Sequence, residues 1–330
     1  MSKINILSPE LPEEDASVDE EVNHGFEPVA VLQVGGRIFA TPQKASSSDL
    51  ATLRRQGPPV NAPVEWGTVD LVGKDEMVVP FTKSYTNPVV VVKPFAKKKS
   101  GSGLLRVTSV RSDHFKLKFQ DWDYLSAKAK PASVRAFYMV AEAGAKNLGD
   151  LAVKAGKAST SVTANVKNVA CTPVDFPSAF ATVPALFSSV ATDNDSDPVL
   201  SRADGVTASG FNLALQEEDA ADNGTPQHGS ETVHWIAIAP GSTTVDGFDV
   251  QVQLQADVLT GKPLTLAFDP SARAFPFTLA DMNSANDLDP AVVRYGKITN
   301  SLLQLYIEEE TSLDRDRNHQ AEDLSLFLGE

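Results

Sequence analysis

The sequence predicts an all-β protein: three tandem antiparallel β-sandwiches of six to seven strands, preceded by an acidic arm and a β-hairpin. Two observations support this prediction. Apolar and polar residues alternate along short segments, which is typical of strands with one buried face. In addition, one residue pattern recurs three times within the 330 residues. The expected divisions are an arm over 1–25, a hairpin and linker over 26–63, and repeats over 64–145, 146–243 and 244–330.

Composition and charge narrow the classes of function. With 42% hydrophobic and 22% charged residues, the chain has the composition of a globular protein. A net charge of −14 argues against nucleic-acid binding, which needs an organised excess of Lys and Arg. The longest apolar run, Val89–Val92, is too short to cross a bilayer, so we expect no membrane insertion. Cys171 stands alone, which excludes an internal disulfide.

The N-terminal part has two sections. Residues 1–25 carry seven acidic side chains against Lys3, so they cannot bury enough apolar surface to offset the entropy of ordering. We expect this arm to be a ragged terminus or an attachment arm that another protein orders. Gly35-Gly36 then separates two apolar runs, which predicts a hairpin with a primed turn. Residues 42–63 have the composition of a linker.

The threefold pattern is clearest in the second and third repeats. Matching residues lie 91 or 92 positions apart. These pairs are Arg202 and Arg294, Glu217 and Glu309, His228 and His319, and Glu231 and Glu322. In the weaker first repeat, Arg106 matches Arg202 at a distance of 96 positions, and no histidine corresponds to His228. A period of this length indicates a tandem domain duplication.

Each repeat has the same succession of strands. An alternating strand predicts Phe115, Phe211 and Leu303 at equivalent buried positions. Aromatic residues followed by proline come before a further apolar strand in every repeat. These openers are Phe81, Tyr85 and Pro88, then Phe176, Phe180 and Pro184, then Phe268, Phe275 and Pro276. Proline suits the start or the edge of a strand, so we expect a strand to begin at each one.

Taken in order, these elements resemble the H-type lectin domain. The resemblance implies a six-stranded sandwich, assembly as trimers, and binding of N-acetylgalactosamine-type sugars at subunit boundaries. Related repeats occur in bacterial and phage surface proteins. The family carries a Trp with polar neighbours as a sugar contact, which makes Trp122, Asp123 and Tyr124, with Arg106, the candidate sugar contacts of repeat 1. Glu218 and Glu310 stand at the Trp position in the other repeats.

Two glutamates are expected to point inward. Glu217 and Glu309 share the strand face of the buried residues, and an inward carboxylate needs a basic partner. The cations available within each repeat are Arg202 with His228, and Arg294 with His319. The cluster either holds the strands together or, as the resemblance implies, reaches a sugar hydroxyl. Its members are Arg202, Glu217, His228, Glu231, Arg294, Glu309, His319 and Glu322.

Signs of metal binding and catalysis are slight. Asp193, Asp195 and Asp197 alternate as calcium ligands do, but Pro198 and Asp204 replace the Gly and Glu that an EF-hand loop requires. A solvated acidic loop is favoured there, and we predict neither a metal nor a cofactor. The sequence contains no Gly-x-Ser-x-Gly elbow and no His-Glu-x-x-His motif. We therefore predict that the protein is not an enzyme.

The preferred function is that of a non-enzymatic structural and adhesion protein, a bacteriophage virion component such as a tail or head fibre. Such a protein is made in the host cytoplasm. Its N-terminal region would bind other virion proteins, and its sandwiches would bind a host surface glycan. We expect a homo-oligomer, with a trimer favoured. The alternative is a bacterial H-type lectin without a virion, in the cytoplasm or at the cell surface. A carbohydrate-processing enzyme is third and has no motif in its favour.

Overall fold

The computed structural model describes residues 62–95, 103–126, 133–165, 170–221, 227–267, 277–299, 302–313 and 318–329. Before residue 62 it gives the backbone of three short strands, β1 (Asn5–Ile6), β2 (Leu32–Val34) and β3 (Arg37–Phe39). The chain forms two compact units, one of Met1–Asn5 with Gly57–Glu330 and the other of Ile6–Gln56.

The second unit contains the predicted hairpin. β2 pairs antiparallel with β3, with Leu32 opposite Phe39 and Val34 opposite Arg37. This pairing agrees with the predicted hairpin, whose turn residues Gly35 and Gly36 lie outside the described residues. Apart from β1, the expected acidic arm over residues 1–25 lies outside the described residues.

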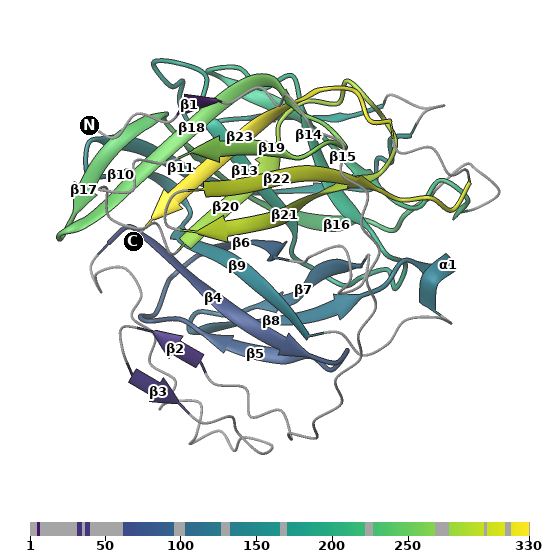
Figure 1. Ribbon diagram of the computed structural model, residues 1–330, viewed down its shortest axis with the longest axis horizontal. Helices are drawn as coiled ribbons and strands as arrows, with labels where there is room; N and C mark the ends of the chain where they lie inside the picture. Colours follow the sequence, from purple (N-terminus) through teal and green to yellow (C-terminus); the bar gives the residue numbers. More distant parts are fainter. Residues whose placement is uncertain are drawn as a thin grey trace, which may run out of the picture. The chain divides into compact units, whose positions relative to one another are not determined.

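The first unit contains three antiparallel β-sandwiches in succession, as the sequence predicts (Figure 1). Repeat 1 has the sheets β4-β9-β6 and β5-β8-β7. Its elements are β4 (Val64–Val72), β5 (Met77–Pro80), β6 (Pro88–Phe95), β7 (Leu104–Val110), β8 (His114–Gln120), the helical turn α1 (Asp123–Ser126) and β9 (Ser133–Glu142).

Repeat 2 repeats this topology with one additional strand at its start. Its sheets are β10-β11-β16-β13 and β12-β15-β14. The strands are β10 (Gly144–Leu148), β11 (Leu151–Thr160), β12 (Thr172–Asp175), β13 (Ala185–Val190), β14 (Leu200–Asp204), β15 (Gly210–Gln216) and β16 (Glu231–Ile238). The additional β10 forms a hairpin with β11.

Repeat 3 follows the same plan as repeat 2. Its sheets are β17-β18-β23-β20 and one that orders β19, β22 and β21. The strands are β17 (Gly241–Val245), β18 (Phe248–Leu259), β19 (Leu264–Ala267), β20 (Phe277–Met282), β21 (Ala291–Thr299), β22 (Leu302–Glu309) and β23 (Glu322–Gly329).

Equivalent residues occupy equivalent places in the three sandwiches. Phe115, Phe211 and Leu303 are each the second residue of their strand, and each is at most 4% exposed. This confirms the prediction made from the repeat. The rings of Phe81 and Tyr85 meet edge to face, and those of Phe176 and Phe180 do the same. The expected strand starts are also observed, since β6 begins at Pro88 and β13 and β20 begin directly after a proline.

The two sheets of repeats 1 and 3 are buried differently. β8 and β22 alternate between buried and partly exposed residues, because one face of their sheet is turned to solvent. Every residue of β13 and β20 is buried, so their sheets are covered on both faces. Strands covered on both faces have nearly continuous apolar sequences. The run Val89–Val92 in β6 has this origin, since all four side chains are buried.

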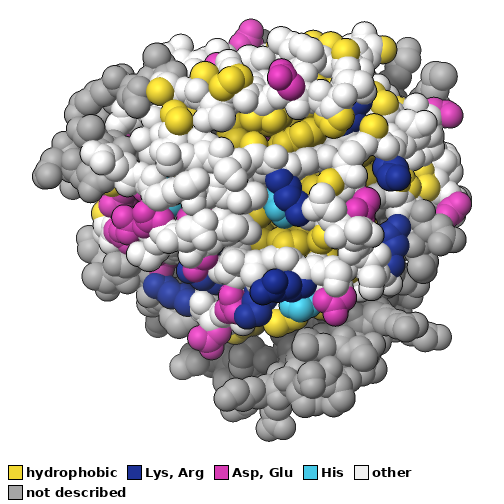
Figure 2. All heavy atoms as spheres, turned by 180° about the vertical axis from the view of Figure 1, so that it is seen from behind, with side chains coloured by type: hydrophobic (Ala, Val, Ile, Leu, Met, Phe, Trp, Pro, Cys, Tyr) yellow, Lys and Arg dark blue, Asp and Glu magenta, His cyan; other side chains and the backbone are white. Residues whose placement is uncertain are grey.

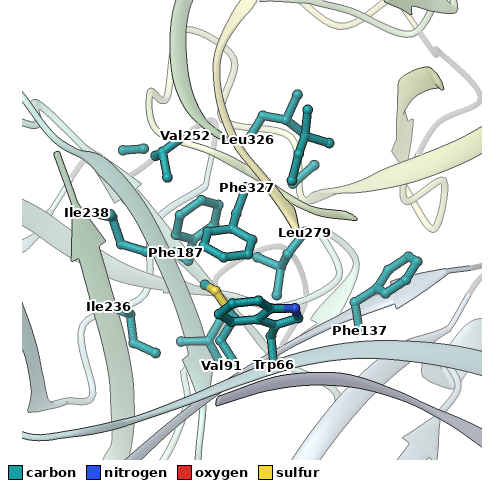
Figure 3. Close-up of a cluster of buried hydrophobic side chains, with 14 of the residues drawn as sticks. Trp66, Val91, Phe137, Phe187, Ile236, Ile238, Val252, Leu279, Leu326 and Phe327 are labelled. Carbon is teal, nitrogen blue, oxygen red and sulfur yellow. The ribbon is translucent and has the colours of Figure 1, made fainter. Parts of the chain in front are cut away.

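The second covered face belongs to a core that the three repeats share. In β9, Tyr138 and Val140 pack inside repeat 1, whereas Phe137 and Met139 point into the shared core. Figure 3 shows side chains of all three repeats pointing toward one another there, among them Val91 of β6, Phe187 of β13 and Leu279 of β20. Because the shared core buries large apolar side chains from every repeat, we expect it to be a main source of cohesion between the sandwiches.

Strand edges also link the repeats. β6, β13 and β20 lie at the edges of their sheets. The Val90 N–H donates to Nδ1 of His234 in repeat 2 at 2.9 Å, and the Leu186 N–H donates to Oγ of Ser325 in repeat 3 at 2.9 Å. Burial lowers the pKa of His234 to about 3, so its ring is neutral and able to accept this hydrogen bond. A side chain of the following repeat thus satisfies an edge N–H that no strand pairs.

Candidate functional site

The predicted Arg, Glu and His residues form two buried clusters, and each cluster joins two repeats. The 1–2 cluster consists of Arg106 from repeat 1 with Glu217, His228 and Glu231 from repeat 2. The 2–3 cluster consists of Arg202 from repeat 2 with Glu309, His319 and Glu322 from repeat 3. Both clusters therefore lie at junctions between neighbouring sandwiches.

The same elements supply both clusters. The arginine comes from the fourth strand of the six-strand plan, β7 or β14. Glu231 and Glu322 open the last strand, β16 or β23. Glu217 follows the end of β15 and Glu309 ends β22, and both side chains turn inward as their strand parity predicts. The histidines come from the segments that lead into β16 and β23.

In the 1–2 cluster, Nη2 of Arg106 donates to Oε1 of Glu231 at 2.6 Å. Nε of Arg106 also donates to the carbonyl of Thr192 at 2.6 Å. Nδ1 of His228 is hydrogen-bonded to Oε1 of Glu217, and its Nε2 lies 3.4 Å from Oε1 of Glu231. Arg106 and Glu231 are at most 1% exposed, so their charges are balanced within the protein.

The 2–3 cluster has corresponding contacts. Nη2 of Arg202 donates to Oε1 of Glu322 at 2.6 Å and to the carbonyl of Asp287 at 3.1 Å. Nδ1 of His319 lies 2.6 Å from Oε1 of Glu309, and its Nε2 lies 3.2 Å from Oε1 of Glu322. Oε2 of Glu322 accepts from Ser284 and Asn286, which holds the loop before β21 in place.

The expected pairing of the arginines was wrong. Glu217 pairs with His228, and Glu309 pairs with His319, as expected. Arg202, however, contacts neither Glu217 nor His228 of its own repeat and pairs with Glu322 of repeat 3. The guanidinium reaches across the junction because β14 lies where its sandwich meets the next one. Sequence matching places residues within a repeat and contains no information on how whole sandwiches pack together.

Arg294 departs from the pattern as well. Its Nε donates to Oε2 of Glu308 on the adjacent strand at 2.6 Å, and its Nη2 donates to the Gly103 carbonyl of repeat 1 at 3.0 Å. It therefore lies at the 3–1 junction, between repeats 3 and 1, and not with His319. Val134, buried in β9, occupies the position of Glu231 there. An apolar residue has thus replaced the carboxylate that the third arginine would meet.

The equivalence of Val134 and Glu231 rests on two ring contacts. Tyr138 packs against Phe115 in repeat 1, and Trp235 packs against Phe211 in repeat 2. Each of these two rings also covers a glycine on the neighbouring strand. Tyr138 and Trp235 are therefore equivalent, and Val134 and Glu231 each precede them by four positions.

Burial and charge shift the pKa values of the clusters. Burial lowers the pKa of Arg106 and of Arg202, while the neighbouring carboxylates oppose this shift. Burial would also lower the pKa of His228, but the hydrogen bond and charge of Glu217 raise it above the ordinary value. Burial favours the neutral form of Glu322, yet His319 and Arg202 bring its pKa below the usual range. Glu322 is therefore held as a carboxylate.

The candidate sugar contacts of repeat 1 have different environments. Trp122 is 2% exposed and packs as a core residue, whereas Asp123 is exposed at the start of α1. Tyr124 is half-buried and contacts other repeats. The Trp122 ring is buried too deeply to stack on a sugar without a rearrangement of the loop.

The loops that contain the Trp position meet in cyclic order. The Tyr124 N–H donates to Oε2 of Glu218 at 3.3 Å, and the Asp219 N–H donates to Oε1 of Glu310 at 3.3 Å. The Thr311 N–H completes the cycle by donating to the Tyr124 hydroxyl at 3.1 Å. Burial raises the pKa of both Glu218 and Glu310. The two glutamates that replace Trp therefore accept hydrogen bonds across junctions.

The acidic loop of repeat 2 is anchored by basic residues of repeat 1. Asp193 forms an ion pair with Lys118 at 2.7 Å and lies 3.8 Å from Arg106. Asp195 accepts hydrogen bonds from the N–H groups of Gly229 and Asp197. Asp193 and Asp195, two of the three candidate calcium ligands, therefore each have protein partners of their own.

A small cavity lies where the three repeats meet. Its lining includes Lys93 of repeat 1, Ser189 and Arg202 of repeat 2, and Asp281 of repeat 3, and its volume is about 60 Å³. Lys93 and Asp281 form an ion pair across it at 2.7 Å. Pockets for small organic ligands are typically several times larger, so this cavity has room only for water or a similarly small species.

Sequence comparison finds one similarity to report. The chain is 28% identical over 258 residues to halomucin of Haloquadratum walsbyi, a match that covers 74% of this chain. The chain spans 3% of the length of halomucin. No protein-family model matches the chain, and no solved structure matches it. The resemblance to the H-type lectin domain stays a prediction.

Proposed function

We propose that the chain is a non-enzymatic structural and adhesion module of a surface-exposed assembly, with a bacteriophage virion fibre as the expected setting. The observation that carries this proposal is the way the repeats are joined. Two buried ionic clusters and one shared apolar core connect the three sandwiches. Contacts of this kind suit a stable scaffold that presents its outer loops.

The Arg, Glu and His clusters are proposed to serve the scaffold and not a glycan. Arg106 and Arg202 are at most 3% exposed, and the carboxylates Glu231 and Glu322 are at most 1% exposed. A sugar could reach these groups only if a junction opened. Among the candidate sugar contacts, Asp123 and Tyr124 retain access to solvent. We therefore propose that glycan binding, where it occurs, uses the loops around α1.

The distribution of charge supports a role that does not involve nucleic acid. On the face shown in Figure 2, Lys and Arg side chains lie among Asp and Glu side chains and do not gather into one basic patch over the described residues. None of the helices in the described ranges has the length and apolarity needed to span a membrane. Similarity to a protein named as a mucin also supports a surface setting.

The threefold arrangement is proposed to be complete within one chain. The lectin resemblance implies three chains around a trimer, whereas here three repeats supply three junctions. Linkage of several weak binding modules raises their combined affinity without new contacts. A homotrimer of this chain would then be a further level of assembly and not a condition for folding.

A combined mass and binding experiment tests the proposal. We expect the purified chain to have the mass of a monomer in light scattering, and to bind immobilised glycans through loop residues. Asp123→Ala should weaken glycan binding at unchanged melting temperature, with exposed Arg111→Ala as the control. Loss of glycan binding in Arg202→Ala without loss of stability would contradict the structural assignment of the clusters. Turnover of an oligosaccharide would contradict the non-enzymatic proposal.

A further inference from the structure

Three ligand-type side chains of repeat 3 converge at the 2–3 junction. Asp287, Glu309 and His319 each offer one donor atom, and the three atoms lie within 4.8 Å of one another. They come from the loop between β20 and β21, from the end of β22 and from the segment before β23. Asp287 is half-buried, so the group opens to solvent on its side.

Glu309 is incompletely satisfied in this position. Its side chain is 3% exposed, and Oε1 contacts Nδ1 of His319 at 2.6 Å. The other oxygen, Oε2, is buried and has no hydrogen-bond partner among the residues that the structure describes. Buried polar atoms are nearly always paired, and the exceptions are frequent at sites of an absent ion or water. The oxygen therefore calls for an additional partner at this place.

The surroundings of His319 also match a metal ligand. Ligating histidines usually donate their second ring N–H to a carboxylate, which fixes the tautomer. Nε2 of His319 lies 3.2 Å from Oε1 of Glu322, and Arg202 holds the same oxygen at 2.6 Å. This arrangement leaves Nδ1 as the atom that is directed at Glu309 and available to an ion.

Charge counting favours a dication. After the proton between His319 and Glu309 has left, as ligation requires, the group and its support contain the carboxylates of Asp287, Glu309 and Glu322 and the guanidinium of Arg202. Their formal sum is a charge of −2, in a largely buried place. A divalent ion would neutralise it, whereas a monovalent ion would leave an excess of negative charge.

We propose that Asp287, Glu309 and His319 bind a divalent transition-metal ion of the Zn²⁺ class, with water in the remaining position. One imidazole and two carboxylates are common ligands of Zn²⁺, whereas Ca²⁺ and Mg²⁺ prefer sites made of oxygen alone. Metal binding releases the proton shared by His319 and Glu309 to solvent and replaces their hydrogen bond with two coordinate bonds. The site would stiffen the 2–3 junction, because Arg202 and Glu322 support it directly.

Repeat 2 contains the matched control. Asp195, Glu217 and His228 are the equivalent residues, but among the described side chains only the repeat 3 group converges as a metal site does. Asp195 and Asp287 both accept a hydrogen bond from the backbone N–H after the histidine, at 2.8 and 3.0 Å, so the difference lies at the histidines. Nε2 of His319 is hydrogen-bonded to Glu322 at 3.2 Å, whereas Nε2 of His228 lies 3.4 Å from Glu231. We expect the repeat 2 residues not to bind the ion.

Zn²⁺ titration by calorimetry, with the full chain first treated with a chelator, tests the proposal. We expect one saturable site per chain, a higher melting temperature with Zn²⁺, and little competition from excess Ca²⁺. Glu309→Gln and Asp287→Asn should each weaken Zn²⁺ binding by at least about 100-fold, while Glu217→Gln leaves it unchanged. Asp287→Asn is the variant expected to disturb folding least, and circular dichroism checks each fold.

Several results would overturn the proposal. One is a wild-type chain that binds no Zn²⁺ in saturable fashion. Another is equal loss of binding in Glu309→Gln and Glu217→Gln, which would make the two clusters indistinguishable. A third is displacement of Zn²⁺ by equimolar Ca²⁺, which would exclude the transition-metal class. Each result bears on the ion alone, since glycan binding and chain mass are measured separately.

Discussion

The junctions between successive repeats centre on buried arginine–glutamate pairs, whereas the junction between the last repeat and the first combines aromatic packing with the ion pair of Lys93 and Asp281. At the first two, an arginine meets a buried glutamate and a His or Ser side chain accepts from an edge N–H. At the 3–1 junction, Phe137 takes the position of His234 and packs against Tyr295 and Phe277 with ring centroids 5.4 Å apart. One strand geometry therefore accommodates two chemistries.

The difference concerns how each junction tolerates change. When one member of a buried ion pair is removed, the other member keeps a buried charge without a partner. The polar junctions therefore depend on every partner. An aromatic junction depends on volume and contact, and it can be repacked by residues of similar size. The edge of β20 shows the same divergence, because the Ala280 N–H donates to the hydroxyl of Tyr295 in its own repeat at 2.8 Å.

The largest expected effect is the loss of an arginine at a polar junction. Arg202→Ala leaves Glu322 buried without its guanidinium and should lower the free energy of unfolding by about 3–5 kcal/mol. Arg294→Ala should cost less than half as much, because the Glu308 side chain is 19% exposed and water can solvate it. Urea denaturation in the presence of a chelator measures both values. Equal losses would mean that the junctions do not differ in this respect.

A smaller effect is expected from the edge caps. Ser325→Ala removes the nearer acceptor of the buried Leu186 N–H and leaves the Asn283 side-chain oxygen at 3.2 Å, so it should cost about 1 kcal/mol. Tyr295→Phe removes the hydroxyl that caps the Ala280 N–H and should cost a similar amount while the ring packing is kept. Denaturation of the two variants side by side tests whether caps from the next repeat and from the same repeat are equivalent. A neutral Tyr295→Phe variant would contradict this expectation.

The smallest expected effect is a pH dependence of the 1–2 cluster. His228 faces Glu217, Asp195, Glu231 and Arg106, and its pKa in the folded state is raised above the ordinary value of 6.5. The stability it contributes is fully present below pH 6.5 and is lost as the pH rises through the folded pKa. Unfolding free energies of the wild type and of His228→Gln should therefore converge at high pH. If the two unfolding free energies diverged as the pH rises, the pKa of His228 would be shifted in the opposite direction and the prediction would be wrong.

Much of the fold followed from local patterns in the sequence. The spacing of 91 and 92 positions identified matching strands. Strand parity predicted that Glu217 and Glu309 point inward, and both are buried beside their histidines. The arginine partners could not be predicted, because they depend on how one sandwich packs on the next. One available signal was the apolar run Val89–Val92, since strands with a single buried face alternate. It indicated a second covered face and hence the shared core.

The side chains that cap the edge strands affect how readily another chain can extend these sheets. An exposed strand edge is a template on which another chain can extend the sheet, and such extension leads to fibres and aggregates. In β6 and β13, side chains of the next repeat accept hydrogen bonds from individual N–H groups and occupy part of this template without offering a new edge. In β20, Tyr295 performs the same task from within its own repeat. At these positions of the three edges, the N–H groups already have acceptors and are not available to an incoming strand.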